Sequence, residues 1–124
     1  MHPEDELSSA AATGNTERVR LLLQNGANVN SINTFGRTPI QVMMMGSTPV
    51  AQLLLDHGAD PNVSDESTGA TPLHDTARLG FLETVRILVQ HHADPNATDN
   101  RNCRPADLAR ENGFLDVAEF LDNV

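Results

Sequence analysis

The sequence contains no tryptophan and no tyrosine, and four phenylalanines are its only aromatic residues. Its core therefore has to be built mainly from aliphatic side chains. The sequence also contains no lysine, so its eight fully charged basic residues are all arginines, against seventeen acidic residues and a formal charge of −9. A chain this acidic repels phosphate backbones. We therefore expect no nucleic-acid partner and favour a partner protein with a basic surface.

Cysteine and long apolar runs are also scarce. Cys103 is the only cysteine, so the chain can form neither an internal disulfide nor a cysteine-based zinc cage. No apolar run approaches the roughly 18 residues that a membrane-spanning helix needs. Residues 1–6 have neither the basic start nor the apolar run of a secretory signal. We expect no contact with a membrane, and a location in the cytoplasm and nucleus.

What the sequence does contain is a repeat with a period of 33 residues. Pro39, Pro72 and Pro105 are spaced by this distance and stand in similar phrases. A second phrase, with Gly-Ala-Asp-Pro-Asn at 58–62 as its clearest copy, keeps the same register. Glycines precede four similar apolar segments, at positions 14, 46, 80 and 113. The 124 residues are therefore expected to form a single domain, 1–124, of four units at approximately 4–33, 34–66, 67–99 and 100–124.

A unit of this length with a Thr-Pro-Leu-His phrase is typical of the ankyrin repeat, a β-turn followed by two helices. Thr71 is expected to cap the first helix with its hydroxyl, and Pro72 suits the first helical position. The mid-repeat glycines are expected to end that helix in a left-handed turn. The predicted fold is an all-α ankyrin-repeat solenoid of four helix-turn-helix units with β-hairpin-like loops. First helices are expected at about 7–12, 39–45, 72–78 and 105–111, second helices at about 16–24, 48–56, 82–90 and 115–122, and loops at 26–36, 58–70 and 92–103.

The second unit departs from this pattern. Pro39 and Gly46 are seven residues apart, whereas Pro72 and Gly80 are eight apart. One residue is about 100° of helical phase, so the first helix of the second unit is expected to be a single short turn. That segment contains three consecutive methionines, which cannot all face inward on a helix. Core filling and an adaptable binding surface both remain open for them.

Three phrases go beyond a general ankyrin pattern: Pro-Ile-Gln-Val-Met-Met-Met-Gly-Ser at 39–47, His-Asp-Thr-Ala-Arg at 74–78 and Gly-Phe-Leu-Glu-Thr at 80–84. With these phrases and the shortened helix, the chain resembles the ankyrin-repeat inhibitors of the cyclin-D-dependent kinases, from about Leu7 to Leu121. Because it has four units, it resembles the four-repeat members of this cyclin-dependent kinase inhibitor family.

The resemblance implies a non-catalytic inhibitor that binds the catalytic subunit of a cyclin-D-dependent protein kinase beside its ATP cleft. Such an inhibitor blocks cyclin binding and activation, and so restrains progression from G1 to S. The positions that match the family's kinase contacts are Glu17, Gln41, Val42, Met43, Met44, Asp65, Asp75, Arg78, Phe81 and Glu83. The chain departs from its relatives at Leu79, where Glu is usual, at Asn15, where Arg is common, and at Glu83, where Asp is common.

Asp75 is the central candidate among these residues. It follows His74 on a first helix, at a position where the general repeat places an apolar residue, so the fold has little need for an acid there. A solvated helix carboxylate is the other interpretation of Asp75.

Other kinds of site find little support in the sequence. His91 and His92 are adjacent but lack a third ligand at a fixed spacing. Arginines near Cys103 could activate its thiol, although a plain loop cysteine is favoured. No catalytic triad order or phosphate-binding glycine loop is present, so we expect no enzyme, no cofactor and no metal, and a monomer. The second functional hypothesis is a generic ankyrin adaptor that recruits a basic protein without inhibiting a kinase.

Overall fold

A computed structural model describes residues 3–124 of the chain, with side chains from Asp5 onward. The chain divides into two compact units, Met1–Asp60 and Pro61–Val124. The first unit contains α1 (Pro3–Ala12), α2 (Thr16–Gln24), α3 (Pro39–Val42) and α4 (Thr48–Asp56). The second contains α5 (Pro72–Leu79), α6 (Leu82–Gln90), α7 (Pro105–Glu111) and α8 (Leu115–Asp122). The described residues include no strand, so the expected all-helical class is confirmed.

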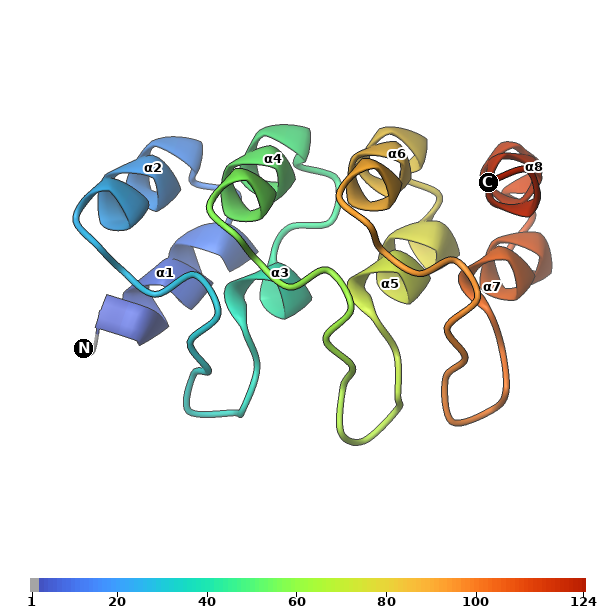
Figure 1. Cartoon of the computed structure of the whole chain (residues 1–124), viewed down its shortest axis with the longest axis horizontal. Coiled ribbons are helices and arrows are strands. Elements are labelled where there is room, and N and C mark those ends of the chain that lie inside the picture. The colour runs from blue at the N-terminus through green and yellow to red at the C-terminus, as the bar shows by residue number, and fades with distance from the viewer. Residues whose placement is uncertain (1–2) are drawn as a thin grey trace. The chain divides into compact units, whose positions relative to one another are not determined.

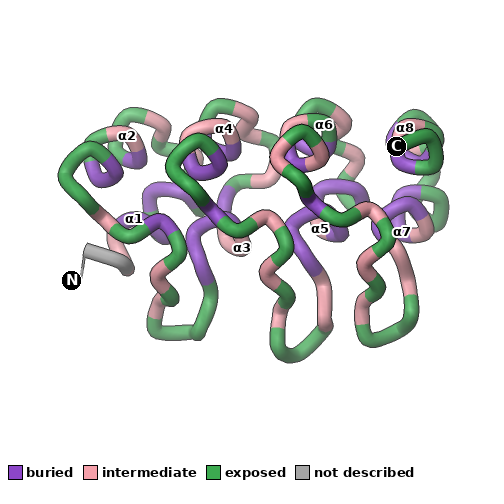
Figure 2. Tube along the Cα trace, viewed as in Figure 1, coloured by how far each residue is buried: buried purple, intermediate pink, exposed green. Residues whose placement is uncertain are grey.

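Within the first unit the helices form two layers, with α1 and α3 in one and α2 and α4 in the other (Figure 1). The loop between α2 and α3 extends away from both layers. Figure 2 shows that these helices have buried stretches, and aliphatic side chains make up most of this core. The fully buried ones are Leu7, Ala11, Val19, Ile40, Val50, Ala51 and Leu54. The core of this unit is therefore aliphatic, as the composition predicts.

The second unit repeats this plan, with α5 and α7 in one layer and α6 and α8 in the other. Its fully buried apolar residues are Leu73, Ala77, Val85, Leu88, Ala109 and Val117. Val85 and Leu88 lie three positions apart on α6, the spacing of one helical face. No helix among residues 3–124 is both long enough and apolar enough to cross a bilayer.

A short backbone-capping device starts three of the first helices. In α5, the Thr71 hydroxyl accepts a hydrogen bond from the His74 N–H at 3.3 Å, as the sequence predicts. The His74 ring reaches back in return and accepts the N–H of Thr71 at 3.0 Å. In α3, the Gln41 Oε1 likewise accepts the N–H of Thr38 at 2.7 Å. These bonds satisfy backbone donors that a helix start otherwise leaves without partners.

The boundaries of two helices differ from expectation. α1 starts at Pro3 instead of near residue 7, because proline and the acidic residues after it suit a first helical turn. α3 is a single short turn, as expected, but it ends at Val42 instead of residue 45. The other bounds agree to within one residue. The limits of the four repeats and of a single domain stay predictions.

The prediction that the mid-repeat glycines end the first helices in a left-handed turn is wrong for Gly46. Gly14, Gly80 and Gly113 adopt positive φ, but Gly46 does not. The reason is that α3 has already ended four residues earlier, at an extended Met43 with φ −55° and ψ 155°. Gly46 instead lies just before Ser47, whose hydroxyl accepts from the Val50 N–H at the start of α4.

Replacing Gly80 with alanine should destabilise the protein more than the same change at Gly113. Both glycines have positive φ, +82° and +80°, which alone disfavours alanine by about 1–2 kcal/mol. A Cβ at Gly80 would also lie 2.7 Å from Cγ of Phe114, whereas a Cβ at Gly113 would meet nothing within 4 Å. This overlap should add about 1–3 kcal/mol at Gly80. Chemical denaturation of both variants measures the difference, and equal losses would contradict this account.

Candidate protein-binding site

His74 fixes the start of α5 in the second unit. Its ring is fully buried. Nδ1 accepts the backbone N–H of Thr71 at 3.0 Å, so the ring proton must lie on Nε2. Nε2 therefore donates to the backbone carbonyl of Cys103, 2.8 Å away. The imidazole thus joins α5 to the loop that leads into α7, and it is a structural residue, not a catalytic one.

Asp75 follows this anchor and faces a different environment. Its side chain is 30% exposed, and its nearest counter-charge is Arg78, with Nη2 and Oδ1 3.6 Å apart. Desolvation by burial raises the pKa of Asp75, an effect that Arg78 offsets only in part. The carboxylate is therefore partly desolvated and weakly paired, and it would gain from a second cation.

Asp75 and Arg78 open onto a hollow of about 460 Å³ within the second unit. Side chains from two loops and from α7 form the rest of its wall. The lining residues are Ser67, Thr68, Asp75, Arg78, Asp99, Asn100, Arg101 and Leu108. The structure thus brings two of the predicted site residues together with a loop that the sequence analysis did not single out.

Asp65 has a structural role that the sequence analysis missed. Its Oδ1 accepts hydrogen bonds from the Ser67 N–H at 2.8 Å and the Ser67 hydroxyl at 2.6 Å. Asn33 does the same in the first unit, where its Oδ1 accepts the N–H of Phe35 at 2.9 Å. Side chains of this type organise turns. Asp65 is therefore first a loop-organising residue, and it remains close enough to Asp75 to contribute to its raised pKa.

The remaining predicted residues of the second unit lie at the α5–α6 turn. Phe81 is 40% exposed, and Leu79, on the other side of Gly80, is 42% exposed. Glu83 is also exposed and forms a long ion pair with Arg86, with Oε1 and Nε 3.8 Å apart. The turn therefore presents two apolar side chains beside an acid. Leu79 thus adds to the apolar surface of this turn.

The methionine segment of the first unit has one buried and one exposed member beside each other. Met43 is 3% exposed and belongs to the core, whereas Met44 is 47% exposed. The Met44 N–H donates to the carbonyl of Ala11 at 2.8 Å. Both interpretations of the methionines therefore apply, each to a different residue. Met43 can support a binding surface but offers almost no side-chain surface of its own.

The other predicted residues of the first unit differ in availability. The Gln41 carbonyl oxygen is occupied in capping α3. Val42 is partly exposed. Glu17 is exposed at the start of α2, where it pairs with Arg20 at 2.6 Å. Asn15 caps the same helix by accepting the N–H of Arg18 at 3.1 Å.

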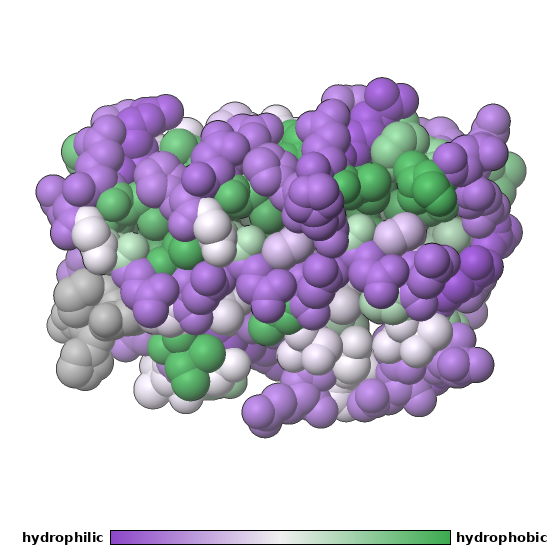
Figure 3. Space-filling view, in the orientation of Figure 1, coloured by the Kyte–Doolittle hydropathy of each residue, from purple (hydrophilic) through white to green (hydrophobic). Residues whose placement is uncertain are grey.

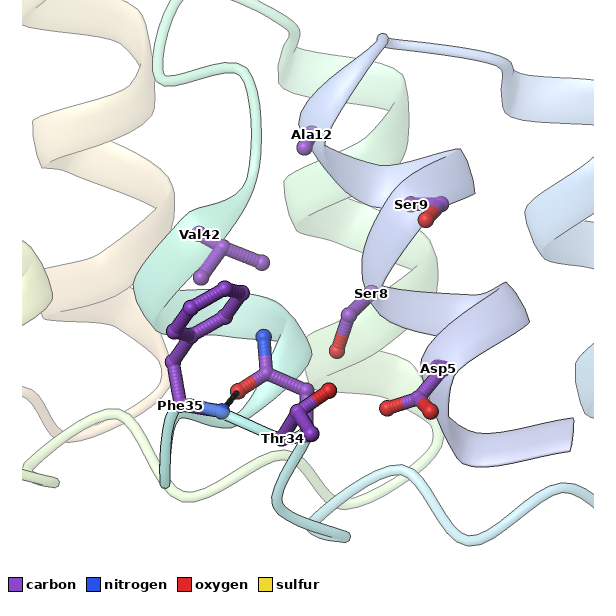
Figure 4. Close-up of a pocket in the computed structure, with 8 residues that line it drawn as sticks. Asp5, Ser8, Ser9, Ala12, Thr34, Phe35 and Val42 are labelled. Carbon is purple, nitrogen blue, oxygen red and sulfur yellow. Dashed lines mark hydrogen bonds between the residues drawn. The ribbon is translucent and has the colours of Figure 1, made fainter. Parts of the chain in front are cut away.

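Phe35 is a surface residue that the sequence analysis did not select. Its side chain is 82% exposed, and Ile32 on the same loop is 64% exposed. Figure 3 shows hydrophobic side chains gathered on this loop. Figure 4 shows the Phe35 ring beside Val42, across a hollow of about 420 Å³ from Asp5 and Ser8 of α1. The sequence signal for this exposed surface was the presence of two large apolar residues in a loop otherwise rich in Asn, Ser and Gly.

Metal and thiol chemistry find no support in the part of the chain that is described. No three His, Cys, Asp or Glu side chains among these residues are grouped as metal ligands would be. Desolvation, and then the nearby Asp99 carboxylate, raise the pKa of the Cys103 thiol. A raised thiol pKa opposes formation of the reactive thiolate. The plain loop cysteine is therefore the better interpretation.

Asp75→Asn should leave the free protein at least as stable as its parent at neutral pH. Because desolvation raises the pKa of Asp75 on folding, the ionised carboxylate disfavours the native state. That penalty exists above the unfolded pKa of aspartate and disappears as the pH falls. Thermal melts from neutral to acidic pH should show the gain at Asp75→Asn shrinking on acidification.

Asp107→Asn is the control, because it should change the stability of the protein in the opposite direction. The backbone N–H of Arg104 donates to Asp107 and lowers its pKa to about 2. Its ionised form therefore stabilises the fold above the unfolded pKa, and this contribution is lost as the pH falls through about 2. Asp107→Asn should thus destabilise the protein at neutral pH. A similar loss at Asp75→Asn would mean that Asp75 is a structural residue.

Comparison with known proteins places this chain in a family. The family model described as "Ankyrin repeats (3 copies)" matches residues 7–99 and 50–123. The chain is 51% identical over 115 residues to cyclin-dependent kinase 4 inhibitor B of Rattus norvegicus, which covers 93% of this chain and 88% of that protein. It is 51% identical over 117 residues to cyclin-dependent kinase inhibitor 2A of Homo sapiens, covering 94% of this chain and 75% of that protein.

A more distant relative shows what the ankyrin fold alone implies. The chain is 34% identical over 119 residues to the tyrosine-protein kinase HTK16 of Hydra vulgaris, covering 94% of this chain but 16% of that protein. Ankyrin units therefore occur in proteins of other functions, and the stronger relation is to proteins named as inhibitors, which supports a regulator without catalytic activity. The chain belongs to the ankyrin-repeat family of cyclin-dependent kinase inhibitors, as the fold and the three sequence phrases together predict.

Proposed function

We propose that this chain is a non-catalytic inhibitor that binds a cyclin-dependent kinase and holds it inactive. The observation that carries the proposal is the identity to proteins named as cyclin-dependent kinase inhibitors along nearly the whole chain. The 115 aligned residues span both units of the chain.

The second unit supplies the chemistry that such binding needs. Asp75 is a partly desolvated carboxylate with only a long ion pair to Arg78. A kinase arginine or lysine could replace water at this carboxylate without disturbing the core. Phe81 and Leu79 present apolar surface next to it on the chain. Charged groups that are fully paired only in the complex favour both affinity and the correct orientation of the partner.

The finer features of the proposal rest on the resemblance. We infer that the kinase is a cyclin-D-dependent one and that the inhibitor binds beside the ATP cleft of its catalytic subunit. Cyclin binding and activation would then be blocked, which restrains progression from G1 to S. We further propose a monomer that binds no nucleic acid or membrane and acts in the cytoplasm and nucleus. The net charge of −9 supports the choice of a protein partner over nucleic acid.

A generic adaptor that recruits a basic protein without inhibiting a kinase is the rival hypothesis. The ankyrin fold permits it, but the relation to named inhibitors does not favour it. A kinase assay separates the two. The purified protein is added to cyclin-dependent kinase 4 with a D-type cyclin and to other cyclin-dependent kinases, and substrate phosphorylation is measured. Unchanged phosphorylation in every case would favour the adaptor.

Asp75→Asn should weaken kinase binding, while Asp65→Asn should act mainly on association. Loss of the Asp75 charge would leave a partner cation unpaired and cost about 2–5 kcal/mol, which is roughly 30-fold or more in affinity. Asp65→Asn keeps the acceptor oxygen that organises the loop, a role that Asn33 fills in the first unit. It should mainly slow association and reduce its salt dependence.

The two variants are compared by kinase-binding kinetics at two salt concentrations, with circular dichroism melts to confirm folding. A folded Asp75→Asn protein that binds and inhibits like its parent would remove Asp75 from the site. That result would also shift the balance toward the adaptor.

A further inference from the structure

Arg101 stands apart from the other arginines of this acidic chain. All eight arginines lie within the described residues; six of them form an ion pair with a carboxylate, and Arg37 has an interaction of its own. Arg101 is exposed, and its guanidinium has neither an ion pair nor a hydrogen bond in this part of the chain. It nevertheless lines the same hollow as Asp75 and Arg78.

The charged side chains of this hollow leave Arg101 without an ion pair. Asp75 and Arg78 face each other at 3.6 Å. Asp99 is occupied differently, because its Oδ1 accepts the backbone N–H groups of Arg101 and Cys103, each at 2.9 Å. Partial burial opposes its ionisation, but these two bonds, together with nearby positive charge that includes Arg101, lower the pKa of Asp99. Neither carboxylate of the hollow forms an ion pair with Arg101, so its guanidinium remains available to a partner.

The loop that carries Arg101 is held in a defined conformation. The Asn100 N–H donates to the Thr68 carbonyl at 2.9 Å, and the Asn100 side-chain amide donates to the Ser67 carbonyl at 3.1 Å. Asn102, on the other side of Arg101, adopts a positive φ of 64°, at the place where the other two loops have glycine. Arg101 is therefore displayed at the tip of a braced turn, which reduces the entropy that its backbone would lose on binding.

We propose that Arg101 is a specificity-determining residue whose guanidinium binds a carboxylate side chain of the inhibited kinase. This inference rests on the proposed function and deepens it. The hollow would then meet a pair of opposite charges on the partner, with a kinase cation at Asp75 and a kinase carboxylate at Arg101. The planar guanidinium suits a carboxylate because it can donate two parallel hydrogen bonds to the two oxygens.

The sign of the effect separates this contact from long-range electrostatics. The protein has a formal charge of −9, and its expected partner surface is basic. Loss of any exposed arginine makes the protein more negative, so overall attraction alone predicts equal or tighter binding for Arg101→Gln. A direct contact with a carboxylate predicts the opposite, because the partner's charge would lose its hydrogen-bond donors.

The test measures binding of cyclin-dependent kinase 4 to the parent protein and to Arg101→Gln, Arg101→Lys and Arg18→Gln. Arg18 is the matched control, since it is half exposed, pairs with Glu6 at 2.9 Å and lies in the other unit. We expect Arg101→Gln to bind about tenfold more weakly, Arg101→Lys to recover part of the loss, and Arg18→Gln to bind like the parent. Circular dichroism melts should coincide for parent and Arg101→Gln, because Arg101 makes no side-chain contact that folding needs.

Two failures are distinguishable. If the parent inhibits the kinase but Arg101→Gln binds equally well or more tightly, the inference about Arg101 is wrong and the proposed function stands. Equal weakening by Arg18→Gln would likewise overturn a specific role for Arg101. If the parent neither binds nor inhibits any cyclin-dependent kinase, the proposed function fails, and the Arg101 contact fails with it.

Discussion

The buried imidazole of His74 is the interaction on which the surface of the second unit depends. One ring nitrogen accepts the N–H of Thr71, and the other donates to the carbonyl of Cys103. An apolar side chain in this position would leave the Thr71 N–H buried without a partner, which is costly in an aliphatic core. The same ring holds α5 against the loop between α6 and α7. Asp75 on α5 and Arg101 on that loop therefore line one hollow.

Four acidic residues of the second unit differ in what their carboxylates bind. Asp65, Asp99 and Asp107 accept backbone N–H groups, so their charges organise loops and a helix start. Asp75 has only a long ion pair to Arg78, and desolvation raises its pKa. Net charge alone therefore overstates the surface available for a basic partner. In the second unit, the proposed recognition rests on few groups, and one of them, Arg101, has the opposite sign to the chain as a whole.

Helix positions could be predicted from the sequence because they depend on local signals. Thr71 and Pro72 start α5 whatever surrounds them. The exposure of individual side chains depends on where each helix ends, and the early end of α3 separates buried Met43 from exposed Met44. The turn role of Asp65 was hidden because one extra residue after it shifts its register by one relative to Asn33 and Asp99. Neither Arg101 nor Phe35 follows a helical period, so only the structure reveals their exposure.

The central claim is that the hollow beside α5 and the turn after it meet the kinase. The most direct measurement is amide hydrogen exchange of the protein alone and in complex with cyclin-dependent kinase 4. The account predicts slower exchange in the complex at residues 74–83 and 99–102, and little change in α8 (Leu115–Asp122). Protection confined to residues 85–90 and α8, with residues 74–83 unchanged, would contradict it.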